Sequence, residues 1–255
     1  HRSGARSVTR RSTASRQRGV TAEGLNLTTL LAVTTIVAAG TCVQATIGFG
    51  LNLLAAPLLL LVAPRLVPGP VLVANLALTA VLSRVNWRDA NKTAVLWAAV
   101  GSVPGTALGI WMLGALVPHL LTLASALFVV AGVGMVASGL PFARTSRAHM
   151  AVGFLASIMG TTTAVNGPPM ALLYRGERGG VVRGTVSLFG CWTTALSLAA
   201  LESTGYLDLD GIAAVVVMAP GIILGIAVAA VAASRVSHRL LSTLTLTVSL
   251  GAGIA

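Results

Sequence analysis

The sequence predicts an all-α, multi-pass membrane protein of two inverted repeats, each a re-entrant helical hairpin followed by three transmembrane helices. The first observation is composition: of 255 residues, 55% are hydrophobic and 9% are charged, and the mean hydropathy is +0.89. Soluble domains average about 25% charged residues. Two further observations, an internal duplication and the distribution of charge between loops, predict the repeats and their inversion. A soluble helical core would need polar outer faces, which these apolar runs lack.

The expected elements follow from the lengths of the apolar runs, since about 20 residues span a bilayer. Seven runs are read as membrane segments: 25–46, 67–82, 93–113, 116–140, 181–201, 211–233 and 240–255. Two others, 51–62 and 150–159, are too short to span alone. The chain therefore divides into a tail (1–24), a first repeat (25–140) and a second repeat (141–255).

Positive charge is concentrated in the tail and in some of the loops, giving a net charge of +11. The tail combines arginines with Ser, Thr and Gly, and it has too little apolar surface to fold. A lipid-facing tail, an over-extended start and part of a targeting segment all remain open interpretations. With 4% aromatic residues, the basic balance indicates membrane topology and anionic headgroups as its cause, and no nucleic acid partner is expected.

The two halves of the chain resemble each other. PGTALGI at 104–110 returns as PGIILGI at 220–226, and GFGLNLLAAP at 48–57 aligns with GTTTAVNGPP at 160–169. The order of these matches is kept while their offsets drift, so the chain is a duplication of about 115 residues. The GxxxG pairs inside the first match, Gly105/Gly109 and Gly221/Gly225, predict close helix packing within the protomer. A homodimer through the same glycines is the second interpretation.

Loop charges predict that the halves are inverted. The loop 83–92 carries three basic side chains, whereas its counterpart 202–210 carries three acids and no base. By the positive-inside rule the two loops lie on opposite sides of the membrane. The loops around Arg144 and Arg178 are both basic, so the chain between them should enter the membrane and return. This scheme places the basic tail outside the cytoplasm, and the segment 25–46 is also long enough for a full span.

The expected hairpin tips carry the predicted site. Broken helices persist at membrane depth only where protein or a wet cavity covers their polar groups. Two half-helices that start at the tips would point N–H groups and about half a positive charge each at the midplane, which suits a small anion. The candidate substrate-binding residues are Gln44, Thr46, Gly48, Phe49, Gly50, Asn52, Thr161, Thr162, Thr163, Asn166, Gly167, Pro168 and Pro169. Simple easing of helix packing by Gly, Thr and Pro is the alternative reading.

Three further polar residues, Asn75, Arg183 and Ser187, are candidates for a path to the tips. Arg183 could equally be a cytoplasmic topology charge, and the other two could make ordinary interhelical hydrogen bonds. No Ser/His/Asp set, HExxH, Walker or Rossmann pattern is present, so neither an enzyme nor a metal or other cofactor is expected.

Both tips also resemble the signatures of a known family. QATIGFGLNLLAAPLLLLVAP at 44–64 and GFLASIMGTTTAVNGPPMALLY at 153–174 are similar to the two half-signatures of the TauE/SafE sulfite exporters. The resemblance implies eight membrane segments in the cytoplasmic membrane of a bacterium and export of sulfite or small organosulfonates. The tips depart from the family at GFGLN and TTTAVNG, where glycines are common, which leaves the anion open.

The predicted function is therefore a secondary transporter, and specifically an exporter, of small anions bound between the tips. The alternatives are a membrane assembly component that transports nothing and a permease for another small anion such as a carboxylate. Transport direction, coupling ion and oligomeric state are not determined by the sequence.

Overall fold

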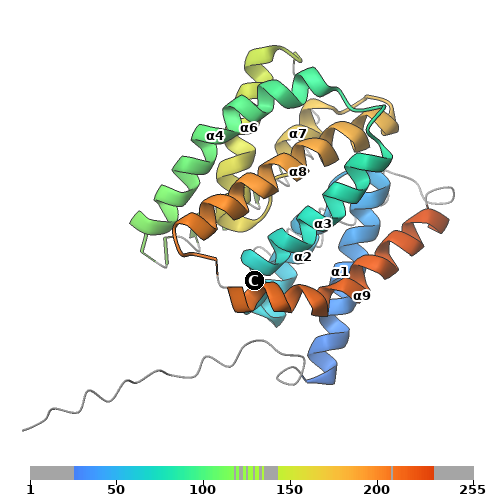
Figure 1. Ribbon diagram of the computed structural model, residues 1–255, viewed down its shortest axis with the longest axis vertical. Helices are drawn as coiled ribbons and strands as arrows, with labels where there is room; N and C mark the ends of the chain where they lie inside the picture. Colours follow the sequence, from blue (N-terminus) through green and yellow to red (C-terminus); the bar gives the residue numbers. More distant parts are fainter. Residues whose placement is uncertain are drawn as a thin grey trace, which may run out of the picture.

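The computed structural model describes residues 26–117, 143–207 and 209–232, together with short pieces between 119 and 134. The tail, most of the predicted segment 116–140 and the segment 240–255 lie outside these residues. All regular elements in the described part are helices (Figure 1). They are α1 (Leu27–Ile47), α2 (Leu51–Val62), η2 (Pro64–Leu66), α3 (Gly69–Val85), α4 (Lys92–Ala115), α6 (Ser146–Thr163), α7 (Pro168–Leu173), α8 (Gly179–Ser203) and α9 (Leu209–Ala232).

Three of the described helices, α1, α4 and α8, are long and apolar enough to cross a membrane. The apolar helices α2 and α3 are shorter, as is the apolar stretch Val215–Val231 of α9. The all-helical membrane architecture is thus confirmed in the part that the structure describes. One expected element differs: the run 150–159 is not half a membrane long, because it belongs to α6, which has 18 residues and is about 27 Å long at 1.5 Å per residue.

Each hairpin turns where the backbone takes a left-handed conformation. α1 ends at Gly48 with φ 98°, and α2 begins after Gly50 with φ 139°; glycine adopts both values without a steric cost. α6 ends at Ala164, also left-handed with φ 64°, and α7 begins with two prolines whose fixed φ suits a helix start. The second tip is therefore 164–167, shorter than the stretch from residue 160 that the sequence indicated.

The helices form two groups (Figure 1). Their hydrophobic cores join near the tips, where Leu53 and Ala56 of α2 pack with Met159 of α6. We call α1, α2, α3 and α9 the first body; its core includes Val33, Leu51, Leu78 and Met218. The second body consists of α4, α6, α7 and α8, with a core around Met170 and Phe189. α3 packs against α8 where the two bodies meet, so this helix crossing is the main junction between them.

Small residues set the closest helix contacts inside each body. A Cβ on Gly105 of α4 would lie 2.3 Å from the backbone oxygen of Phe154 in α6, and one on Gly221 of α9 would lie 2.7 Å from that of Thr34 in α1. Neither helix pair could approach as closely with a larger residue at these positions. The predicted role of the GxxxG pairs in packing within the protomer is confirmed.

Positive charge gathers at one end of the molecule, which we call the basic end. Here the α3–α4 loop packs on the start of α8, because the Asn91 N–H donates to Thr185 Oγ1 at 3.0 Å. At the same end, Arg144, just before α6, pairs with Glu177 and donates to the Leu173 carbonyl at the end of α7. The starts of α4, α6 and α8 thus share this end. Its basic side chains are Arg84, Arg88, Lys92, Arg144, Arg147, Arg175, Arg178 and Arg183.

Candidate functional site

The two hairpin tips are in direct contact. Asn52, in the first turn of α2, donates from Nδ2 to the Ala164 carbonyl at 2.5 Å. A Cβ on Gly167 would lie 2.9 Å from the Cβ of Phe49, so only glycine permits this approach. Two tips that are more than 110 residues apart in sequence thus form one surface inside the protein.

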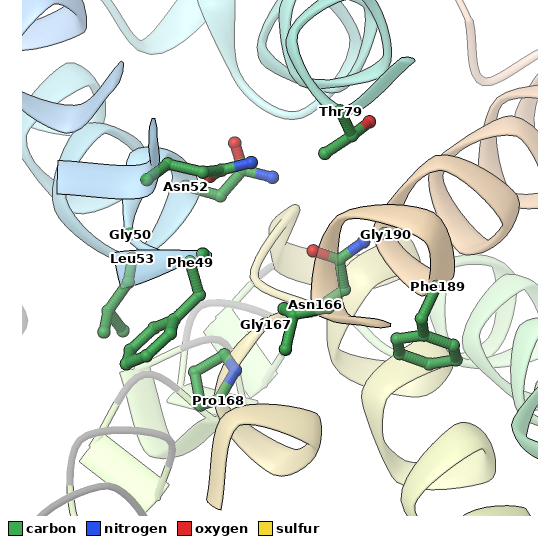
Figure 2. Close-up of a pocket in the computed structure, with 13 residues that line it drawn as sticks. Phe49, Gly50, Asn52, Leu53, Thr79, Asn166, Gly167, Pro168, Phe189 and Gly190 are labelled. Atoms are coloured by element: carbon green, nitrogen blue, oxygen red, sulfur yellow. The ribbon is translucent and has the colours of Figure 1, made fainter. Parts of the chain in front are cut away.

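A small cavity lies between these tips and the α3–α8 crossing (Figure 2). It has a volume of about 20 Å³, which is enough for one water molecule. Eight of the predicted substrate-binding residues line it: Gln44, Gly48, Phe49, Gly50, Asn52, Asn166, Gly167 and Pro168. The remaining lining residues, Leu53, Thr79, Val186, Phe189 and Gly190, were not predicted. They come from α2, α3 and α8 and stand in ordinary apolar runs, so only the polarity of Thr79 could have signalled them.

The other predicted site residues are Thr46, Thr161, Thr162, Thr163 and Pro169, and they do not line the cavity. Thr46, Thr162 and Thr163 donate their hydroxyls to carbonyls four residues earlier in their own helices, a common bond for threonine within a helix. Thr161 instead bonds the Ser197 hydroxyl of α8 at 2.9 Å. Because α6 extends through residues 161–163, these side chains belong to helix packing in this structure.

A chain of buried hydrogen bonds joins the tips through the α3–α8 crossing. Gln44 Nε2 donates to Asn75 Oδ1 at 3.0 Å, and Asn75 Nδ2 donates to Thr194 Oγ1 at 2.9 Å. From the second tip, Asn166 Nδ2 donates to Thr193 and Thr194 at 2.9 and 3.1 Å. Asn75, a predicted pathway residue, therefore holds the first tip to α8, and Thr194 accepts from both sides.

The helix starts at the tips offer fewer free N–H groups than the sequence suggested. The first N–H of α2, on Leu51, donates to Gln44 Oε1 at 2.9 Å. The first two residues of α7 are Pro168 and Pro169, which have no N–H at all. The Leu51 N–H is therefore not free for an anion in this form, and Pro168 and Pro169 contribute no donor to the start of α7.

The two remaining pathway candidates lie on α8. Arg183 stands in its first turns beside the first tip, where a Cβ on Gly48 would lie 3.0 Å from its Cα. Its guanidinium donates to the Thr46 carbonyl at 3.5 Å. Ser187, one turn further, is fully buried, and its hydroxyl has no hydrogen-bond partner in the described part of the chain. Neither residue lines the closed cavity, but Arg183 places a cation next to it.

The fold and the cavity define an integral membrane protein with a buried polar site between two broken helices. Such sites are typical of secondary transporters. The family model described as Sulfite exporter TauE/SafE matches residues 32–255, and the chain belongs to this family of membrane transporters of the sulfite or anion type. No curated protein and no solved structure matches the chain.

Proposed function

We propose that this protein is a secondary transporter that exports a small anion, sulfite or an organosulfonate, across the cytoplasmic membrane through the cavity between the hairpin tips. The observation that carries the proposal is the meeting of two broken helices at a polar cavity in the protein interior. We propose no enzymatic activity and no cofactor. The partners are then the anion and the bilayer, with homodimerisation left to measurement.

Helix directions support an inverted repeat as the basis of this function. The residue numbers of the contacting pairs increase together along α4 and α6, from Gly105 with Phe154 to Gly109 with Ile158. These two helices are therefore parallel, and both start at the basic end. The residue numbers of the contacting pairs also increase together along α9 and α1, starting from Gly221 with Thr34, so these two helices are parallel as well. α9 follows the far end of α8, so α1 approaches the tips from the side opposite to α6.

The glycines at these contacts are equivalent in the duplicated sequence, because Gly105 and Gly221 are 116 residues apart and stand in the repeated PGxxLGI motif. Thr34 and Phe154 both lie on the long helix of a hairpin. Each hairpin therefore packs on the fourth helix of the other half in the same way. This exchange supports a pseudo-twofold relation of the halves, with the tips near its axis.

The closed cavity is too small for the proposed cargo. It holds about one water, and a sulfur with its oxygens is larger than that. Transport then requires the two bodies to separate at the tips, and Asn52 and Asn166 would release their present acceptors and donate to the anion. Arg183, beside the first tip, would attract the anion from the basic end.

Export fits the orientation that the positive-inside rule gives, with the basic end in the cytoplasm. An anion that leaves the cytoplasm gains about 2.3 kcal/mol per charge for each 100 mV of membrane potential. Outward movement of a monovalent anion would then be favourable without a second solute.

Proteoliposome flux tests the proposal. Purified protein should carry labelled sulfite or a short organosulfonate down a gradient, and the near-isosteric Asn166→Leu variant should lose the flux while it still elutes as one monodisperse species. Thr35→Val serves as a control, because Thr35 is exposed on α1 and bonds only the Leu31 carbonyl in the described structure. Absence of flux for sulfite, sulfonates and carboxylates alike would favour the membrane assembly component.

A further inference from the structure

The side-chain amides that line the cavity present oxygen atoms where a side-chain anion site would need N–H groups. Three side-chain amides line it, those of Gln44, Asn52 and Asn166. Each directs its NH₂ group to a protein acceptor, on Asn75, Ala164 and the Thr193/Thr194 pair respectively. The oxygen of Gln44 is also used, by the Leu51 N–H. The amide atoms that remain for a ligand in this form are therefore the side-chain oxygens of Asn52 and Asn166.

Asn52 Oδ1 is the strongest indication. The side chain is 4% exposed, and this oxygen has no hydrogen-bond partner among the residues that the structure describes. Its identity as oxygen is fixed by the other half of the amide, since the Ala164 carbonyl that Nδ2 contacts can only accept. Leaving a buried acceptor unsatisfied is unfavourable, so a donor or a cation at this point would stabilise the closed form.

Asn166 supplies a second oxygen on the opposite wall. Its nitrogen faces the threonines of α8, and Figure 2 shows its oxygen on the side of Asn52. Both long helices that end here, α1 and α6, also end with their carbonyl groups toward the tips. A helix C-terminus carries about half a negative charge, whereas α2 and α7 have lost the N–H groups of Leu51, Pro168 and Pro169 as free donors.

The volume of the cavity and the charges around it limit the class of ligand further. A cavity of about 20 Å³ accepts one water or one small monovalent ion. No carboxylate lines it, and divalent ions such as calcium depend on carboxylate oxygens. The nearby cation, Arg183, is not part of the lining, and its guanidinium contacts the Thr46 carbonyl.

We infer that the closed cavity is a binding site for a monovalent alkali cation of about the size of sodium, held by Asn52 Oδ1, Asn166 Oδ1 and backbone carbonyls of the tips. Unwound backbone at helix breaks coordinates such ions in other secondary transporters. Ion binding would hold the tips together and stabilise the closed form. Only the further role of this ion in coupling rests on the proposed anion transport.

Thermal unfolding of the full chain in detergent tests the site directly. Sodium chloride is titrated against choline chloride at constant ionic strength, so that general salt effects cancel. The melting temperature should rise with sodium, because a ligand that binds only the folded state stabilises it by RT ln(1 + [L]/Kd). Equal melting temperatures in sodium, lithium, potassium and choline would mean that the cavity holds only water, and the inference would be wrong.

Two variants of Asn52 separate the oxygen from the NH₂ group. Asn52→Asp and Asn52→Leu both lose the bond to Ala164, but only the aspartate keeps an oxygen at the site. Asn52→Asp should retain the sodium-dependent rise with equal or higher affinity, whereas Asn52→Leu should weaken it at least tenfold. Equal loss in both would assign the effect to the contact between the tips and overturn the cation site. Thr35→Val should behave like the parent.

The outcomes for the two proposals are distinguishable. Sodium-dependent stabilisation without any anion flux would leave the cation site standing and contradict the transport function. Anion flux without sodium-dependent stabilisation would support transport and contradict the cation site. Flux that is unchanged when choline replaces sodium would contradict only the role of the ion in coupling.

Discussion

Asn52 and Thr162 show that a polar side chain in a membrane helix can have opposite uses. Both are buried in the tip region. Asn52 links the two hairpins and leaves its side-chain oxygen at the cavity without a hydrogen bond in the described structure. Thr162 instead donates its hydroxyl to carbonyls of its own helix. The difference arises because a threonine hydroxyl reaches the carbonyl one turn earlier, while an asparagine at a helix start extends beyond it.

At this scale we predict that two Thr→Val changes differ in effect. Thr194→Val removes the acceptor shared by Asn75 and Asn166 and should destabilise the protein by about 1–3 kcal/mol, because buried donors lose their partner. Thr162→Val removes a hydroxyl bonded only within α6 and should leave anion flux close to that of the parent. Melting temperature and flux are measured for both. A larger loss for Thr162→Val would contradict the assignment of the network.

A second residue-scale prediction concerns Gly105. Its replacement by alanine places a Cβ 2.3 Å from the Phe154 carbonyl oxygen, so α4 must move away from α6. Overpacking of this kind costs about 1–3 kcal/mol. Gly134→Ala is the matched control, since this helical glycine has nothing within 4 Å of its Cβ position. Denaturant or thermal unfolding should separate the two variants, and equal stability would disprove the close α4–α6 contact.

At the scale of the element, each hairpin is one long and one short helix that meet at a left-handed turn. α1 and α6 have 21 and 18 residues, and α2 and α7 have 12 and 6. The long helix of each hairpin packs on α9 or α4. Because of this difference in length, the packing of the long helices sets the position of the tips, and the short helices lead the chain away from them.

The inverted arrangement that we propose for the two hairpins leads to a topology prediction. In a background without Cys42 and Cys191, single cysteines at Arg88 and at Glu202 should react with a membrane-impermeant maleimide from opposite faces. Both positions are exposed, on the α3–α4 loop and at the end of α8. Labelling of both from one face would contradict the inverted repeats and, with them, the approach of the hairpins from two sides.

At the scale of the whole molecule, two bodies meet at a junction that is polar around the cavity and apolar beside it. Gln44, Asn75, Thr194 and Asn166 bridge the tips across the junction, and a small apolar cluster joins α2 to α6 through Leu53, Ala56 and Met159. Hydrogen bonds can exchange partners with water or with an anion as the bodies separate. A core of interdigitated side chains has no such substitute, so movement should occur between the bodies.

A cross-link between the bodies should therefore stop transport. A Cβ on Gly190 of α8 would lie 4.0 Å from the Cβ of Thr79 in α3, within the range that disulfides adopt. Oxidised Thr79→Cys/Gly190→Cys protein should lose anion flux and regain it on reduction. Each single-cysteine variant, oxidised in the same way, controls for changes to the cavity wall. Full flux through the oxidised double variant would show that the junction does not open.

The sequence by itself determined the membrane class and the positions of the two hairpins, because these depend on local properties. The length of an apolar run limits what spans a bilayer, and Gly48, Gly50 and Pro168 act on the backbone wherever they stand. The family follows from the same motifs. Eight cavity residues were predicted for this reason.

Only the tertiary structure decided which polar groups are free for a ligand. Thr79 and Gly190 reach the cavity because α3 crosses α8, and no spacing within either helix encodes that crossing. The donors of Asn52 and Asn166 looked available in the sequence, yet Ala164 and the α8 threonines take them up. A hydrogen bond needs both partners in place, so whether a buried amide offers its nitrogen or its oxygen depends on contacts between elements that are distant in the chain.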